Sequence, residues 1–187
     1  MANAIAAIPT QPTVRTALMD IPAVRSERPD GSDRPVESVW DYPRPPAVVP
    51  DGRLVEIGFD GVLIASTTDA RRVLETSHPP TWYLPSEDVL EGSLQPGRGH
   101  SICEWKGRAT YWDVVVGDHR LRRAAWSYPN PLAPYAAIAG HVAFYPTDLT
   151  CTVDGETVMP QAGGFYGGWI TSDVEGPFKG EPGTLGW

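Results

Sequence analysis

The sequence predicts a mainly β protein, a compact small barrel or sandwich of short antiparallel strands with one or two short helices. Strand-like runs recur at roughly 8–12-residue intervals and are separated by Gly and Asp-Gly turns, a spacing typical of β-sandwiches and barrels. The chain has 187 residues, of which 20 are Pro and 19 are Gly, a composition that favours turns and short elements. Strands and helices do not alternate along the chain, which argues against a Rossmann fold or a TIM barrel.

Composition divides the chain into three segments. Residues 1–33 are rich in Ala, Pro, Arg and Asp, and their weak helical period is interrupted by Pro22, so we expect a flexible N-terminal tail. Residues 34–160 carry the strand-like runs and form the predicted β-rich core domain. Residues 161–187 combine many glycines with Trp, Phe and Tyr and show no period, so we expect an irregular C-terminal arm on the surface.

The first half of the core predicts a hairpin followed by helical segments. Residues 53–66 first alternate between apolar and polar side chains and then become continuously apolar. They contain Asp60-Gly61, a pair typical of tight hairpin turns. Residues 69–77 are predicted to form a short helix capped by Thr68 or Asp69. In residues 85–94, Ser86 is expected to cap a brief helical segment.

The second half predicts a meander. Residues 101–107 and 108–117 are expected to be consecutive strands joined near Lys106-Gly107, and residues 119–128 complete the meander. Two further strands are predicted over residues 141–146 and 149–160, the latter folding back at Asp154-Gly155. One or two helical turns are expected over residues 131–140.

Charge and cysteine content limit the classes of partner. The net charge is −8 with a pI near 4.9, so a phosphate backbone would be repelled and we expect no nucleic acid. The basic run 119–123 fits a solvated strand edge. No apolar run is long enough to cross a membrane and no secretory segment is recognisable, so we expect no membrane association. Two cysteines make no disulfide framework, which favours the cytoplasm.

One candidate site lies in residues 75–89. The run His78-Pro79-Pro80 favours an extended chain that presents Trp82 and Tyr83. Glu87 and Asp88 follow and could act as a general acid and base. The alternative is that both carboxylates lie at a helix N-terminus, where they interact with the helix dipole.

A second candidate site is the run Cys103-Glu104-Trp105-Lys106-Gly107. A tight turn there could bring Cys103 and Lys106 together, and a nearby ammonium favours the reactive thiolate. Lys106 in an apolar, aromatic setting could also form a Schiff base. The alternative is a buried cysteine beside a surface lysine, and Cys151 is interpreted as an ordinary core residue.

Aromatic residues near this turn could line a pocket. Tyr111 and Trp112 are adjacent on a predicted strand and point to opposite faces, so one can join Trp105 and Trp82 as a ligand-binding wall. A thick aromatic core is the alternative. The histidines are scattered, and ordinary strand-end histidines are favoured over a metal site built from His100, His141 and a carboxylate. No motif for a cofactor is present, and no metal or other cofactor is predicted.

The pattern W-x-Y-P-x-P occurs twice, at residues 40–45 and 126–131. The two copies share no ionisable residue, which argues against shared chemistry. We interpret them as aromatic plugs at two equivalent corners of a pseudo-symmetric β domain.

Several of these motifs together resemble the bacterial and fungal family called domain of unknown function 427. The resemblance rests on SVWDYPRPP, FDGVLIAS, LETSHPPTWYLPSEDV, CEWKG, ATYW and AAWSYPNP, and it covers about residues 35–158. The final segment is similar to the tail of actinobacterial members. The resemblance implies a compact β-rich domain, and its matching motifs contain five site candidates: Tyr83, Glu87, Asp88, Cys103 and Lys106.

Some members carry a nucleotidyltransferase label, which the residues do not support. That chemistry needs a Gly-Ser pair followed by two carboxylates that hold Mg²⁺. The nearest match, Gly31-Ser32-Asp33, lies in the predicted tail and lacks the following carboxylate pair.

Three functions remain open. The favoured one is a small-molecule enzyme with an aromatic-lined pocket, in which Lys106 polarises or attacks a carbonyl while Glu87 or Asp88 moves protons. The second is a non-enzymatic module that binds a small ligand by stacking and cation–π attraction. The third is a structural protein whose C-terminal arm docks on a second copy to form a homo-oligomer.

Overall fold

The computed structural model describes residues 34–184, 186 and 187, so the predicted tail over residues 1–33 lies outside the described residues. Its largest element is a seven-stranded antiparallel sheet in the order β2-β5-β6-β10-β9-β8-β7. These strands are β2 (Ala47–Asp51), β5 (Ala70–Glu75), β6 (His78–Pro85), β7 (Leu94–Cys103), β8 (Gly107–Val116), β9 (His119–Ser127) and β10 (His141–Phe144). The order ends at β2 and β7 without closing on itself.

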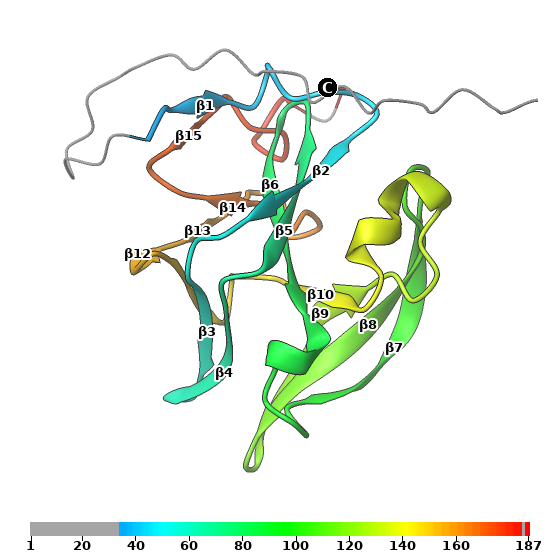
Figure 1. Ribbon diagram of the computed structural model, residues 1–187, viewed down its shortest axis with the longest axis vertical. Helices are drawn as coiled ribbons and strands as arrows, with labels where there is room; N and C mark the ends of the chain where they lie inside the picture. The colour runs from blue at the N-terminus through cyan, green and yellow to red at the C-terminus, as the bar shows by residue number, and fades with distance from the viewer. Residues whose placement is uncertain (1–33, 185) are drawn as a thin grey trace, which may run out of the picture.

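A second antiparallel sheet packs on the first. Its order is β12-β11-β3-β4, with strands β3 (Val55–Phe59), β4 (Val62–Thr67), β11 (Thr150–Val153) and β12 (Glu156–Thr157). Figure 1 shows this sheet beside the large, strongly curved one. The mainly β prediction is confirmed in its sandwich-like form, and the described strands form no closed barrel.

Four short strands complete the architecture as two pairs. They are β1 (Glu37–Ser38) with β15 (Val174–Glu175), which run parallel, and β13 (Met159–Pro160) with β14 (Trp169–Ile170). Two 3₁₀ helices, η1 (Ser86–Asp88) and η2 (Ala133–Ile138), are the described helices. No helix in the described part of the chain is both long and apolar enough to cross a membrane.

Strand periodicity gives the large sheet two different faces. Trp82 and Tyr83 are neighbours on β6 and point to opposite sides, as alternation requires. Trp82 joins the main core with Ile57 and Phe144, all at most 1% exposed. Tyr83 joins a second cluster on the concave side, and that side carries the candidate site.

The predicted turns are confirmed. Asp60 and Gly61 connect β3 to β4 with φ values of 51° and 75°. Asp154 and Gly155 connect β11 to β12 with φ values of 49° and 81°. Such consecutive positive φ values are what two-residue hairpins use, and Asp-Gly adopts them at low cost.

The prediction of a helix over residues 69–77 is wrong, because this segment contains strand β5. Val73 and Leu74 do not share a helix face: Val73 lies in the concave-side cluster and Leu74 packs near Val39 and Tyr42. Pairing with both β2 and β6 supplies ladder hydrogen bonds that outweigh a weak local preference for helix.

The helical segment near Ser86 exists, but Ser86 does not cap it. Pro85 occupies the position before η1, and no side chain makes a cap hydrogen bond there.

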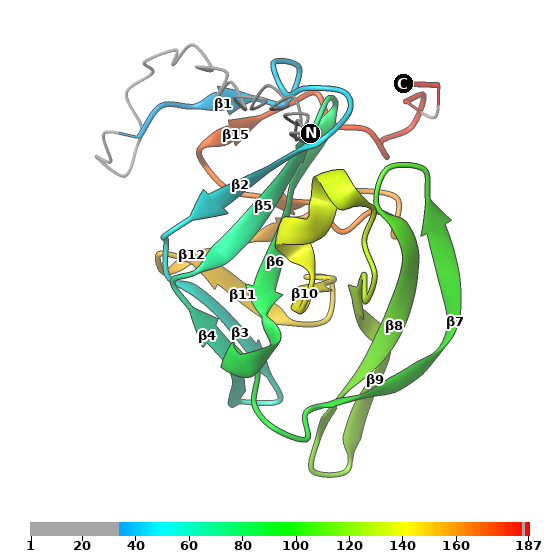
Figure 2. The same cartoon turned by 45° about the vertical axis from the view of Figure 1, so that its right-hand side comes forward.

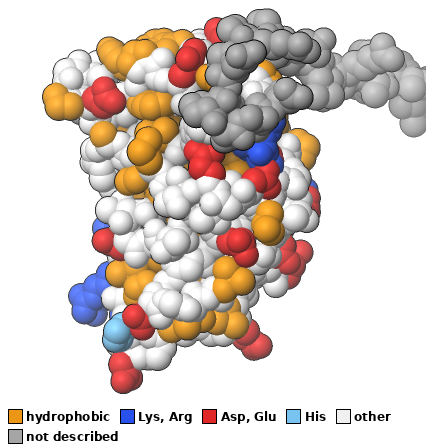
Figure 3. Space-filling model, turned by 90° about the vertical axis from the view of Figure 1, so that its left-hand side faces the viewer, with side chains coloured by type: hydrophobic (Ala, Val, Ile, Leu, Met, Phe, Trp, Pro, Cys, Tyr) orange, Lys and Arg blue, Asp and Glu red, His pale blue; other side chains and the backbone are white. Residues whose placement is uncertain are grey.

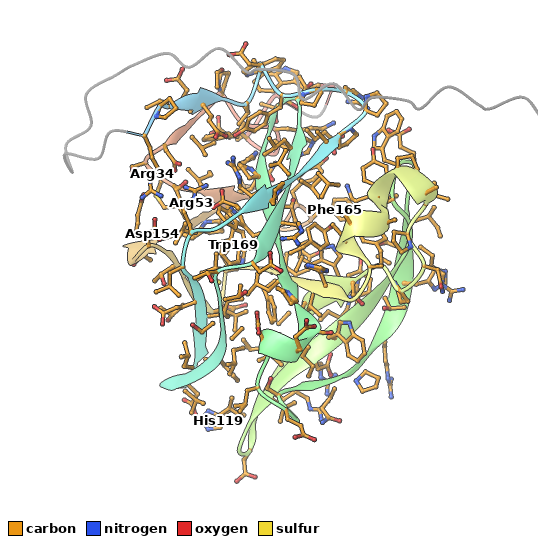
Figure 4. All side chains as sticks on the ribbon, in the orientation of Figure 1. Arg34, Arg53, His119, Asp154, Phe165 and Trp169 are labelled. Atoms are coloured by element: carbon orange, nitrogen blue, oxygen red, sulfur yellow. The ribbon has the colours of Figure 1, made fainter. Side chains whose placement is uncertain are left out.

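A charged network attaches the C-terminal arm to the sheets. Arg53 pairs with Asp51 at 2.9 Å and with Asp173 of the arm at 2.7 Å. The Arg53 guanidinium also lies 4.7 Å from the centre of the Trp82 ring, and Trp82 stacks on Trp169 with ring centroids 6.1 Å apart. Figure 4 shows Arg53 and Trp169 on the same side of the molecule. The arm therefore contributes a fully buried tryptophan to the core.

Candidate functional site

A cavity of about 310 Å³ lies on the concave side of the seven-stranded sheet. Strands β5, β6, β7, β8 and β9 contribute to its wall, and residues 161–167 of the arm close another side. Figure 2 shows η2 between β5–β6 and β7–β8. The residues that line the cavity come from the sheet, its turns and the arm.

Seven of the residues that line the cavity are tyrosine or tryptophan. Trp126 contacts two of the tyrosines, with ring centroids 6.2 Å from Tyr83 and 4.4 Å from Tyr145. The Trp126 indole N–H donates to the Tyr83 hydroxyl over 3.3 Å, and the Tyr111 hydroxyl donates to Ser101 Oγ over 3.0 Å. These bonds fix the orientation of the rings in the wall.

The arm packs directly on this wall. A Cβ atom at Gly167 would lie 2.1 Å from Trp126 Cη2, so the backbone can approach the ring this closely because Gly167 has no side chain. Phe165, two residues earlier, also lines the cavity and is 68% exposed, and Figure 4 shows it on the η2 side of the molecule.

Four aromatic residues were predicted to bind ligand, and the structure places two of them at the cavity. Trp105 and Tyr111 line it. Trp82 lies in the main core, and Trp112 packs against that core while its indole N–H donates to Ser127 Oγ over 2.9 Å. Alternation along β6 and β8 turns these two rings away, so the prediction for Trp82 and Trp112 is corrected.

Lys106 is the most unusual residue of the cavity. It sits in the turn between β7 and β8, is 8% exposed, and has its Nζ 6.0 Å from the centre of the Tyr135 ring. Among the described residues no carboxylate forms an ion pair with it. A buried ammonium without an anion is costly, so this position favours an acceptor supplied from outside the chain.

The two lysines of the sequence both line this cavity. The second, Lys179, belongs to the arm, and its Nζ donates to the Trp187 carbonyl. Lys106 is therefore the lysine available to a ligand.

A second donor without an acceptor lies next to Lys106. Trp105 Nε1 is buried and has no hydrogen-bond partner among the described residues. The guanidinium of Arg44 lies 6.0 Å from the Trp105 ring centre and is paired with Glu104 at 3.3 Å. An indole N–H can only donate, so this nitrogen is an unsatisfied donor enclosed within the cavity wall.

Cys103 lies beside two tyrosines in the same cavity. The Tyr128 hydroxyl hydrogen-bonds with the Cys103 thiol, and burial followed by the nearby Tyr83 raises the pKa of Tyr128 far above its usual range. Burial likewise raises the pKa of Tyr83. Both side chains stay phenols at neutral pH, so they act as hydrogen-bonding groups and not as bases.

His78 is held neutral by its surroundings. Burial first, and then the charge of Lys179, lowers its pKa to about 4 from an ordinary value of 6.5. The Gln161 amide donates to His78 Nδ1 over 2.9 Å and to the Lys179 carbonyl over 2.7 Å. This linkage joins β6 to the arm at the cavity's edge.

Replacing His78 with asparagine is expected to flatten the pH dependence of the free energy of unfolding. The lowered pKa of His78 stabilises the folded state above pH 6.5, and this stabilisation is lost as pH falls towards about 4. Urea unfolding at pH 7 and pH 5 measures the difference, with His119→Asn at an exposed position as the control. Equal pH dependence in His78→Asn and wild type would contradict the assignment.

The predicted acid–base pair does not reach the cavity. Glu87 and Asp88 are exposed on η1 and do not line it, so they do not converge with Lys106. The cavity carboxylates are instead Glu75, which is half-buried on β5, and Glu104, which pairs with Arg44. Glu75 was missed because its segment was predicted to be helical; as the end of a strand facing His78 across a two-residue turn, it could have been found.

The repeated hexapeptide does two different things. Trp40 of the first copy is 43% exposed and contacts Trp187 at 5.1 Å. Trp126 and Tyr128 of the second copy line the cavity. The second copy is thus a part of the site that the interpretation as a purely structural device missed.

The suggested histidine site has no counterpart in the described residues. His100 is exposed on β7, and His141 Nδ1 lies 2.9 Å from the Ala139 carbonyl. No group of three or more His, Cys, Asp or Glu side chains that could hold a metal ion comes together in residues 34–184, 186 and 187.

Comparison with known proteins places the chain in a family. A family model described as "Domain of unknown function (DUF427)" matches residues 47–158, which include strands β2 to β12 and most of the cavity wall. No curated protein is similar enough to match the chain.

Proposed function

The chain belongs to the DUF427 family, and we propose that it binds a small aromatic carbonyl compound or carboxylic acid in the aromatic cavity. The observation that carries this proposal is Lys106, a buried lysine with no ion pair among the described residues, next to the partnerless N–H of Trp105. The Lys106 ammonium donates hydrogen bonds and accepts none, so a carbonyl or carboxylate oxygen complements it.

The cavity walls determine the shape and size of the rest of the ligand. Flat rings from Tyr83, Trp126 and Tyr145 favour a planar or unsaturated body that stacks in offset or edge-on geometry. A volume of about 310 Å³ is at the lower end of the range for ligand pockets, which runs from about 300 to 1,000 Å³. The ligand is therefore a small molecule and not a polymer segment.

Replacing Lys106 with methionine is expected to weaken the binding of benzoate by about 10- to 100-fold, because a charge-assisted hydrogen bond of about 1.5–3 kcal/mol is lost. Quenching of tryptophan fluorescence during benzoate titration measures the dissociation constant. Arg108→Gln, which removes one positive charge from an exposed residue of β8 outside the cavity, is expected to bind like wild type. Equal affinities for Lys106→Met and Arg108→Gln would overturn the proposal.

A second candidate function is catalysis at the same place, favoured by the half-buried Glu75. Its carboxylate lines the cavity with Lys106, and no described residue forms an ion pair with it. Lys106 would polarise a carbonyl oxygen while Glu75 takes the proton from the adjacent carbon, leaving the electron pair in an enolate held by the ammonium. Return of the proton completes the exchange.

Deuterium exchange tests this second candidate. Phenylacetone in D₂O is expected to exchange its α-hydrogens faster with the protein than without it, and Glu75→Gln removes the acceleration while leaving benzoate affinity intact. ¹H NMR follows the exchange. If benzoate binds but exchange is not accelerated, the catalytic role of Glu75 is excluded and the first candidate function, ligand binding, remains.

A further inference from the structure

A groove next to the aromatic cavity is lined by arginines. Four arginines and a single carboxylate, Asp113, line this groove: Arg98 from β7 and Arg120, Arg122 and Arg123 from β9. Asp113 is engaged by Arg120 at 2.9 Å and by the backbone N–H of Arg123 at 2.9 Å. Among the described residues no ion pair involves Arg98, Arg122 or Arg123.

Two β-bulges at the same level of the sheet produce this cluster. The β8–β9 ladder shifts register between Trp112 and Val114, and Arg123 adopts a φ of 53° there. The β7–β8 ladder shifts between Pro96 and His100, next to Arg98. A positive φ in a non-glycine residue is uncommon and often marks a functional position, and bulges re-aim side chains in the same way.

Gly97 is required for this packing. A Cβ atom at Gly97 would lie 2.9 Å from the Tyr111 carbonyl oxygen, which is closer than real contacts allow. The glycine lets β7 lie tightly on β8 and holds the neighbouring Arg98 in the groove.

The arginine groove is continuous with the aromatic cavity. An intermediate hollow shares Tyr111, Tyr145 and Phe165 with the cavity and shares Arg122 and Arg123 with the groove. The Arg123 guanidinium lies 4.0 Å from the centre of the Tyr111 ring, so one cation stands at the junction. A ligand lying along this wall would have its aromatic body on Tyr111 and Tyr145 and its far end among arginines.

The charge of this region contrasts with that of the rest of the molecule. The chain carries a net charge of −8, and Figure 3 shows acidic side chains dispersed over one face. Gathering four guanidinium groups against one carboxylate is unfavourable by itself, because like charges repel. A bound oxyanion would relieve this repulsion and could accept paired N–H donors from the guanidinium forks.

We propose that the arginine groove binds the phosphate-type anionic tail of the ligand whose aromatic body occupies the cavity. This inference rests on the proposed function and deepens it: the ligand is an elongated molecule with an aromatic end at Lys106 and an oxyanion end at Arg98 and Arg122. Arg123 stacks on the ring between them and completes the anion site.

A set of simple probes tests the two ends separately and together. Isothermal titration with benzoate reports on the cavity, inorganic phosphate reports on the groove, and ω-(4-carboxyphenyl)alkyl phosphates of increasing chain length report on both. One chain length is expected to bind at least 100-fold more tightly than benzoate or inorganic phosphate, because the second contact becomes intramolecular. Raising the salt concentration is expected to weaken phosphate binding, as for exposed charges.

Variants then assign the ends. The double variant Arg98→Gln/Arg122→Gln is expected to lose phosphate binding and the gain of the bridging ester, while benzoate affinity and thermal unfolding stay unchanged. Arg108→Gln is the charge-matched control. Phosphate binding that survives the double variant, or no chain-length optimum in wild type, overturns the inference. Lys106→Met is expected to lose benzoate binding and to keep phosphate binding. A failure of the arginine groove can therefore be told apart from a failure of the proposed function at Lys106.

Discussion

Replacing Trp169 with alanine is expected to lower the free energy of unfolding by about 3–5 kcal/mol, the range for a large aromatic residue removed from a core. Trp169 is fully buried, stacks on Trp82, and donates its indole N–H to the Phe144 carbonyl over 3.0 Å. Its loss leaves a cavity between the two sheets and an unsatisfied carbonyl. The arm that closes the ligand cavity would be loosened in the same step.

Urea unfolding followed by circular dichroism measures this effect. Phe165→Ala is the control, since it removes an aromatic ring from the same arm at a position 68% exposed, and it is expected to change stability by less than about 1 kcal/mol. Similar losses in the two variants would show that the arm, despite its buried tryptophan, contributes little to the folded core.

Replacing Arg53 with glutamine is expected to cost about 3–5 kcal/mol, the range for removing one partner from a buried ion pair. The change removes the guanidinium that pairs with both Asp51 and Asp173, while Asp51 keeps its contact with Arg72 Nε at 3.0 Å. Arg53 is held by Asp51 and Asp173, and these three side chains are 5–12% exposed. The matched control is Arg71→Gln on β5, whose partner Asp69 is 71% exposed, and there we expect less than about 1 kcal/mol.

The cost of Arg53→Gln is expected to depend on pH. Burial acts to raise the pKa of Asp51, but the hydrogen bonds and charge of Arg53 outweigh it, and the pKa is lowered below 3.8. A lowered carboxyl pKa stabilises the folded state above the unfolded value and loses this effect as pH falls through the folded value. The difference between wild type and variant should therefore shrink below about pH 4. An unchanged difference at pH 7 and pH 3 would contradict this account.

Local turn chemistry made much of the fold predictable. Asp60-Gly61, Asp154-Gly155 and Lys106-Gly107 all mark hairpins, because each pair suits a tight turn between alternating runs. The error over residues 69–77 has the opposite origin. Nothing within that segment excludes a helix, and its strand state depends on pairing with β2 and β6.

The site was predictable where the local sequence alone marks its residues. The turn carrying Cys103 and Lys106 and the neighbouring Tyr83 could be identified as candidates from the local sequence, and the structure brings all three to one cavity. Glu87 and Asp88 were chosen by nearness in sequence to Tyr83, but η1 turns them to solvent. Trp126 reaches the cavity through the register of β9 on β8 and β10, which one sequence does not reveal.

The placement of both lysines at one cavity has a practical consequence for handling the molecule. Reagents that acylate amines, such as activated esters used for dyes or biotin, find side-chain targets on this chain at this cavity alone. Immobilisation through lysine would therefore block the cavity, whereas attachment through another group would leave it open. Conversely, protection of Lys106 from acylation, read by mass spectrometry of proteolytic peptides, offers a measure of cavity occupancy.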